Sequence, residues 1–356
     1  MGTLSAVLVF AFLVVAEVHG CSDGFEDVGG QCFSFRSEML TSWEQARNSC
    51  STLGPNVVLA SITDPNIHRD VYEYIQTFGL SGSFWLGGSD ADFEGDWHWL
   101  DGSRILRGTP FWAIHNGVLG WSQEPDGGSN ENCLALDQER KYYFNDLPCA
   151  EGHHPLCQEL ERVQNSQGDR RELVRPYENV THLSICILRR KGTPDTGGIV
   201  KGLICLVVIL FVACCHGCNV GYEDVAGKCL NFYVSASLTW DEGKAYCEAN
   251  GGVLASIKTA SELRAAFEYI KYYGLIESFW LGGSDAAVEG DWSWIVDGTR
   301  IDKGTPYWAL SYGIFGYSHE PDGGSDENCL LMDSKRYYFF ADANCAQTNH
   351  VLCQQV

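Results

Sequence analysis

Acidic and amide side chains gather late in the first half of the chain, around Cys133 and Cys149. Four carboxylates that lie close together repel one another strongly unless a cation is between them. Oxygen ligands carried by loops are the ligands that Ca²⁺ prefers. We therefore predict a calcium site from Glu124, Asp126, Glu131, Asn145 and Asp146.

A second acidic group follows about two hundred residues later, in nearly the same order. Its carboxylates are Glu320, Asp322, Glu327 and Asp342. Ala341 stands where the first group has Asn145, so one oxygen ligand is missing. We expect calcium to bind here too, but more weakly.

The cysteines show that the whole region is repeated. Gaps of 11, 18, 83, 16 and 8 residues in the first set become 11, 18, 82, 16 and 8 in the second. FWLGGSD, EGDW and EPDGGS also occur in both halves. Two disulfide-bonded domains of one kind are expected, each large enough for its own core. The two sets are Cys21, Cys32, Cys50, Cys133, Cys149, Cys157 and Cys218, Cys229, Cys247, Cys329, Cys345, Cys353.

Each domain is predicted to be α+β. A Gly-Gly turn between Cys21 and Cys32 indicates a small hairpin. Thr41 to Glu44 fits a capping box before one helix, and Asp64-Pro65 fits the start of a second helix that runs through Tyr74. Thr239 with Glu242, and Thr259 with Glu262, fit the corresponding starts in the second copy. Short aromatic and β-branched runs then predict an antiparallel sheet with a long irregular loop region after Gly87.

These features together resemble the C-type lectin-like domain family, over nearly the full length of both domains. The resemblance rests on the long-form pattern of six cysteines, Phe84–Gly88, Glu-Pro-Asp and Phe144-Asn145-Asp146. It implies three disulfides in each domain and a long calcium-binding loop region. The implied pairs are Cys21–Cys32, Cys50–Cys157, Cys133–Cys149, Cys218–Cys229, Cys247–Cys353 and Cys329–Cys345.

The resemblance also implies that one set of side chains binds both the metal and a sugar. In the family, the residues matching the first acidic group hold calcium, a cis proline lies between the first two, and two sugar hydroxyls complete the coordination. Glu-Pro-Asn is typical of mannose-type binders and Gln-Pro-Asp of galactose-type binders. Glu-Pro-Asp supplies two acceptors and no amide donor, so it assigns neither sugar.

An auxiliary calcium site of the family is only half matched. Asp90 and Glu94 fit it, as do Asp285 and Glu289 in the second copy. Gly127 and Asn132 do not complete it, so we do not predict this site.

Composition indicates an extracellular protein. Sixteen cysteines in 356 residues are typical of an oxidising compartment. A net charge of −22 disfavours nucleic acid and anionic membranes as partners. Residues 1–20 fit a secretory signal peptide. The domains are then expected at 21–158 and 218–356, with a linker at 159–217.

The linker contains an apolar run at 203–215 that ends in the same His-Gly-Cys context as the first signal. It is short for a transmembrane helix, which would also leave the second domain in the cytosol. A buried linker helix and a relic signal peptide from gene duplication or fusion are the alternatives, and we favour the relic. Asn179 begins a glycosylation triplet, and four cysteines of this region fall outside both sets: Cys186, Cys205, Cys214 and Cys215.

Other interpretations of the same residues remain. The acidic groups fit a solvated loop, and paired carboxylates also occur in glycosidases, but no separate acid and nucleophile stand out. Cys149, His153, His154 and Cys157 have zinc-like spacing, although disulfides fit better. Trp85, Trp97 and Trp99 fit the core, whereas Trp112 and Trp121 fit core or sugar stacking equally.

The sequence therefore predicts a secreted, non-enzymatic, calcium-dependent lectin that recognises and agglutinates microbial surface glycans in innate immunity. Homo-oligomers are possible within this prediction, and membrane association is not expected. The alternative is a lectin-like domain that binds a protein or mineral surface without sugar, above all in the second copy.

Overall fold

The computed structural model describes residues 20–117, 120–160, 217–313 and 316–356. The predicted signal segment at 1–19, the glycosylation triplet at Asn179 and the apolar run at 203–215 lie outside these ranges, as do Cys186, Cys205, Cys214 and Cys215. Within the described ranges, no helix is both long and apolar enough to cross a membrane.

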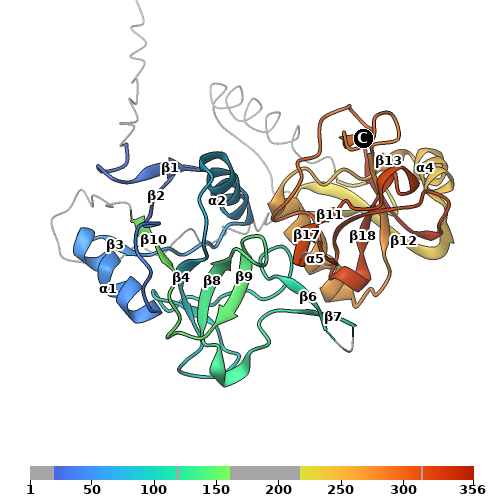
Figure 1. Cartoon of the computed structure of the whole chain (residues 1–356). Coiled ribbons are helices and arrows are strands. Elements are labelled where there is room, and N and C mark those ends of the chain that lie inside the picture. Colours follow the sequence, from blue (N-terminus) through green and yellow to red (C-terminus); the bar gives the residue numbers. More distant parts are fainter. Residues whose placement is uncertain (1–19, 118–119, 161–216, 314–315) are drawn as a thin grey trace, which may run out of the picture.

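The described parts form two domains of the same α+β architecture, shown in blue to green and in yellow to red in Figure 1. The elements of domain 1 are β1 Glu26–Val28, β2 Gln31–Phe35, α1 Trp43–Leu53, β3 Val57–Leu59, α2 Pro65–Phe78, β4 Phe84–Ser89, β5 His98–Trp99, β6 Ile114–Gly117, β7 Gly120–Gln123, η1 Gly128–Asn130, β8 Cys133–Asp137, β9 Tyr143–Leu147 and β10 His154–Glu159. Those of domain 2 are β11 Glu223–Val225, β12 Lys228–Leu238, α4 Trp240–Ala249, β13 Gly252–Leu254, α5 Ala260–Tyr273, β14 Phe279–Ser284, β15 Ser293–Trp294, β16 Leu310–Gly313, β17 Gly316–His319, η2 Gly324–Asp326, β18 Cys329–Asp333, η3 Ser334–Arg336, β19 Phe339–Ala343 and β20 Asn349–Gln355.

One main sheet runs through each domain. Its strand order is β1-β2-β10-β4-β8-β9 in domain 1 and β11-β12-β20-β14-β18-β19 in domain 2. The prediction of an antiparallel sheet needs one correction, because β4 pairs with β10 in parallel, and β14 pairs with β20 likewise. The sheets are therefore mixed. The parallel pair arises because the last strand returns to the middle of the sheet, between the N-terminal hairpin and the site-bearing strands.

The helices begin near the predicted residues. Ser42 caps α1 and forms a capping box with Gln45, one residue later than the predicted Thr41 to Glu44. Thr41 cannot serve as the cap because its backbone pairs with His153 across the domain. Asp64 caps α2 with Pro65 in the first turn, and this helix extends four residues past Tyr74 to a left-handed Gly79. The predicted caps Thr239 and Thr259 are confirmed in domain 2.

Tryptophan side chains hold the helices to the sheet. Trp43 in α1 donates from its indole nitrogen to the Leu86 carbonyl of β4 at 2.8 Å, and Trp240 repeats this with Leu281. Trp85, Trp97 and Trp99 are buried, as predicted for core residues. Burial of such large apolar side chains is the main stabilising contribution to each core.

Six disulfides form in the pairs that the family resemblance implied. The zinc-like spacing of Cys149 and Cys157 is thereby explained, because each bonds to another cysteine. Cys133–Cys149 is the bridge beside the acidic group: it ties the start of β8 to the segment after β9. Strand β8 leads out of the loop that holds Glu124 to Glu131, and β9 carries Asn145 and Asp146.

Candidate metal centre

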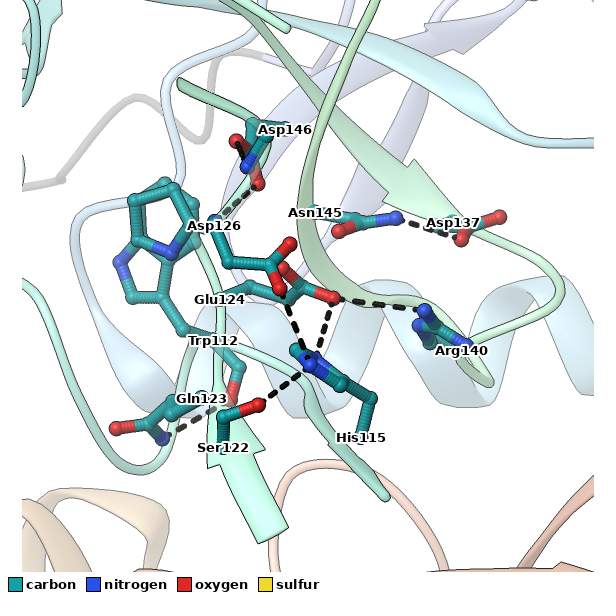
Figure 2. Close-up of polar contacts among 12 residues, drawn as sticks. Trp112, His115, Ser122, Gln123, Glu124, Asp126, Asp137, Arg140, Asn145 and Asp146 are labelled. Atoms are coloured by element: carbon teal, nitrogen blue, oxygen red, sulfur yellow. Dashed lines mark hydrogen bonds and ion pairs between the residues drawn. The ribbon is translucent and has the colours of Figure 1, made fainter. Parts of the chain in front are cut away.

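The acidic group of domain 1 lies where the long loop returns to strands β8 and β9. Asp126, Glu131 and Asp146 each place an oxygen within 4.8 Å of the others, and Glu124 lies beside Asp126 with His115. Figure 2 shows Glu124, Asp126 and Asp146 around one region, with Asn145 next to it on β9. The five residues predicted from the sequence thus come from one loop and one strand of the same domain.

The backbone holds the loop against Asp146. Its two carboxylate oxygens accept hydrogen bonds from the Asp126 and Gly127 amides, at 3.3 and 2.9 Å. The peptide bond between Glu124 and Pro125 is cis, as the family resemblance implied. Gly127 has a spatial role as well, because a Cβ there would collide with the Glu131 side chain. Any larger residue at this position would push Glu131 away from the acidic group.

Glu124 is the most buried carboxylate of the group, at 3% exposure. Its Oε1 contacts His115 Nδ1 at 3.1 Å and Arg140 Nη2 at 3.5 Å, whereas its buried Oε2 has no hydrogen-bond partner. Burial raises the pKa of Glu124 to about 9; Asp126 and Asp146 add to the rise and Arg140 opposes it. A buried carboxyl with an unpaired oxygen among other carboxylates is the chemistry of a cation-binding site.

Two residues that the sequence reasoning missed complete the surroundings. His115 contacts Glu124 through Nδ1 and Asp126 Oδ2 through Nε2, each at 3.1 Å, and Ser122 bonds to the same ring (Figure 2). Asp137 at the end of β8 accepts a hydrogen bond from Asn145 Nδ2 at 3.0 Å. The amide oxygen of Asn145 is thereby left available for a metal. The signal for Asp137 was present: both copies end strand β8 or β18 with Asp.

Domain 2 repeats the arrangement with fewer ligands. Asp342 accepts from the Asp322 and Gly323 amides at 3.1 and 2.7 Å, and Glu320, Asp322 and Asp342 form a three-carboxylate group. Glu327 is not in that group, unlike Glu131 in domain 1. Ala341 is buried in β19 and offers no side-chain oxygen.

The buried glutamate of domain 2 is held mainly by charge. Glu320 is 1% exposed and lies 2.9 Å from Arg336, but neither of its oxygens accepts a hydrogen bond of good geometry. Burial raises the pKa of Glu320 to about 9 against the opposing charge of Arg336. Ser311 occupies the position of His115 and bonds to Asp322. Both sites therefore contain a buried glutamate and two aspartates. They differ at two positions, where domain 1 has Asn145 and His115 and domain 2 has Ala341 and Ser311.

The other residues that the sequence suggested for calcium or sugar binding lie outside the two acidic groups. Asp90 is buried and bonds to the Gly95 amide, and it joins no group of three metal-ligating side chains among the described residues. Trp112 is buried with its indole nitrogen bonded to Leu106, so it is a core residue. Trp121 lies under the Arg336 guanidinium of domain 2, which fits a contact between domains rather than a surface for sugar stacking.

Two stretches of the sequence, residues 40–159 and 236–355, match the Lectin C-type domain family. The chain belongs to the C-type lectin family. As a member of this family, the protein is non-enzymatic. Its acidic groups are candidate metal sites.

The related C-type lectins are distant. Human C-type mannose receptor 2 is 25% identical over 276 residues, which is 76% of this chain but 14% of the receptor. Perlucin from Haliotis laevigata is 28% identical over 169 residues, which is 47% of this chain and 92% of perlucin. The chain therefore spans a small part of the receptor, while one domain and its flanks span nearly all of perlucin.

Proposed function

We propose that domain 1 binds Ca²⁺ through Glu124, Asp126, Glu131, Asn145 and Asp146, and glycans through the same side chains. The observation that supports this most is the bare, buried oxygen of Glu124 among three further carboxylates. A bound calcium ion would coordinate vicinal hydroxyl groups of a sugar. The protein would supply the acceptors, the fixed loop and the carboxamide oriented by Asp137.

His115 adds what the Glu-Pro-Asp motif lacks. Glu124 and Asp126 offer only acceptors, whereas each hydroxyl of a sugar can also accept a hydrogen bond. The ring of His115 lies against both carboxylates, with each of its nitrogens 3.1 Å from one of them. In this structure its two nitrogens face Glu124 and Asp126, so an N–H would reach a sugar hydroxyl only once a bound cation draws these carboxylates away from the ring. On that basis we assign His115 the donor role in domain 1, and in domain 2 the hydroxyl of Ser311 occupies that position.

Domain 2 is proposed as a weaker calcium site. It lacks the oxygen that Asn145 supplies, and its Glu327 does not join the group formed by the other three carboxylates. This favours the alternative for domain 2, a lectin-like surface that binds a protein or mineral without sugar. A secreted protein with one strong and one weak site would recognise microbial glycans mainly through domain 1.

The test uses the full chain and two variants that silence one site each, Asp146→Ala and Asp342→Ala. Binding to immobilised glycans and to whole bacteria is measured in calcium and after chelation. We expect Asp146→Ala and chelation to abolish binding, and Asp342→Ala to leave most of it. Binding that survives chelation in the parent chain would contradict the calcium mechanism. The preferred glycan would also decide between mannose-type and galactose-type ligands.

A further inference from the structure

The two domains contact each other through matching residues. Thr109 Oγ1 donates to the Tyr337 carbonyl at 2.5 Å, and Thr305 Oγ1 donates to the Lys141 carbonyl at 2.6 Å. Thr305 is the counterpart of Thr109, and Tyr337 is the counterpart of Lys141, in the aligned repeats. If residue i of one domain contacts residue j of the other, and the counterparts of i and j also contact each other, the interface has two-fold symmetry. The tandem domains are thus packed like the subunits of a symmetric dimer.

Residues on the symmetry axis meet their own counterparts. The rings of Tyr143 and Phe339, equivalent residues of β9 and β19, lie 5.2 Å apart. They belong to one buried apolar cluster that joins the domains, made of Ala113, Ile114, Tyr143, Ala309, Leu310 and Phe339. The Tyr143 hydroxyl donates to the buried Trp308 carbonyl at 2.6 Å. Figure 1 shows the β6–β7 hairpin, which begins at Ile114, on the side of domain 1 next to domain 2.

Helices α2 and α5 extend the same interface. Asn66 donates to its counterpart Ser261 at 2.8 Å, which places these two N-terminal turns on the axis. Arg69 forms an ion pair with Asp302 at 2.6 Å, and Arg264, its counterpart, donates to the Thr109 carbonyl at 2.9 Å. The contacts are buried and apolar at the centre and polar and partly exposed at the rim, as in a stable subunit interface.

One pair of arginines joins this interface to the acidic groups. The Arg140 guanidinium lies 4.3 Å from the ring centre of Tyr317 in domain 2, and 3.5 Å from Glu124 in its own domain. Its counterpart Arg336 lies 5.7 Å from Trp121 in domain 1, and 2.9 Å from Glu320. Trp121 and Tyr317 are themselves counterparts. Each guanidinium thus contacts a site glutamate on one side and an aromatic ring of the other domain on the opposite side.

We propose that Arg140 and Arg336 are positioning residues that link each calcium-site glutamate to the opposite domain, so that an aromatic residue of one domain sets the calcium affinity of the other. The ring fixes the guanidinium by a cation–π contact, and the guanidinium fixes the buried carboxylate that would face the metal. A loose guanidinium would let the carboxylate leave that position. This inference rests on the proposed calcium sites.

The experiment measures calcium affinity calorimetrically in the full chain after calcium is stripped. Asp342→Ala silences domain 2, so that only the site of domain 1 is titrated. In that background, Tyr317→Ala should weaken calcium binding about fivefold, although Tyr317 belongs to the silenced domain. Tyr272→Ala, an 83%-exposed tyrosine of the same domain, is the matched control and should leave the affinity unchanged. The mirror arm places Trp121→Ala in the Asp146→Ala background and reads the site of domain 2.

A second measurement tests the contact without calcium. Thermal unfolding in chelator is compared for Arg140→Ala, Tyr317→Ala and the double variant. The effects should not add, because the two side chains share one contact. Additive effects, or a Tyr317→Ala chain with the calcium affinity of the Tyr272→Ala control, would overturn the inference. A parent chain without any calcium binding would overturn the proposed function and the linkage, while non-additivity in chelator would still support the contact between domains.

Discussion

Asn145 donates a hydrogen bond from its side-chain nitrogen to Asp137, which turns its amide oxygen toward the acidic group of domain 1. Asp333 is the counterpart of Asp137 in domain 2 and is present at the end of β18, but Ala341 gives it no amide to orient. The supporting residue of domain 2 is therefore in place while the ligand that it would support is absent.

This relationship makes Ala341→Asn a gain-of-function variant. The new side chain should find Asp333 as its acceptor and add one oxygen to the acidic group. We expect calcium affinity of domain 2 to rise about tenfold, or about 1.4 kcal/mol. Calorimetry in the Asp146→Ala background reads this site alone. The same substitution added to Asp342→Ala should give no gain, and a gain there would show that the new amide acts outside the site.

Removing each of two disulfides with similar loop lengths should distinguish a loss of folding stability from a loss of calcium binding. Cys21–Cys32 closes 11 residues and Cys133–Cys149 closes 16, so removal of either should cost about 3 kcal/mol by chain entropy. Only Cys133–Cys149 ties the strands beside the acidic group. Replacing that pair with alanine should also weaken calcium binding, whereas replacing Cys21 and Cys32 should not. Equal calcium affinities in the two variants would contradict the assigned role.

The buried His68 should make domain 1 sensitive to acid. Its Nε2 bonds to the Tyr142 carbonyl at 2.8 Å, its Nδ1 has no partner, and burial lowers its pKa to about 4. The unfolded chain binds a proton near pH 6.5 and the folded domain does not. The contribution of His68 to stability should therefore fall as pH drops below 6.5 and level off near 4, with a loss of about 2 kcal/mol by pH 5. Burial raises the pKa of Glu124 to about 9, so that carboxyl adds stability as pH falls over the same range, and the contribution of His68 must be read against a variant without its ring.

Urea unfolding of the calcium-free chain between pH 8 and pH 5 measures this loss. His68→Gln keeps a donor for Tyr142 without a titrating ring, so the stability of this variant relative to the parent should rise by about 2 kcal/mol between pH 8 and pH 5. His98→Gln is the control, because that ring is 40% exposed to water. Parallel pH profiles for the parent and His68→Gln would refute the assignment.

His115→Ser gives domain 1 the residue that domain 2 has at this position. If the ring donates to a sugar hydroxyl, glycan affinity should fall by about tenfold while calcium affinity changes less. Glycan binding at saturating calcium and calorimetry with calcium alone separate the two effects. A parallel loss of both affinities would instead mean that His115 orients Glu124 and Asp126 for the metal.

The sequence predicted the local features more completely than the ones that depend on distant partners. Residue types and spacing were enough to predict the repeated disulfide-bonded domain and the core tryptophans. They also predicted the helix starts at Asp64, Thr239 and Thr259. The parallel pairing of β4 with β10 did not, because pairing between strands seventy residues apart depends on the return path of the chain. The capping box moved from Thr41 to Ser42 for the same reason, since a backbone bridge to His153 decides it.

The proposed ligand residues could be named from short motifs and the family resemblance, but their neighbours could not. Asp137 and Arg140 act through side chains that reach across the sheet or the domain boundary. The Asp that ends both β8 and β18 singles out Asp137, but nothing in the residues after β8 indicates that Arg140 lies between Glu124 and the other domain. The contact of Trp121 with Arg336 was missed likewise, because it joins residues more than two hundred positions apart.

The symmetric packing of the domains has a consequence for how the protein responds to dilution. An interface with two-fold symmetry is complete once two copies have paired. Here both copies lie on one polypeptide. Their effective concentration is set by the connecting segment and does not depend on how much protein is present. The chain should therefore keep its two sites in a fixed mutual geometry at concentrations where a dimer of separate subunits would fall apart.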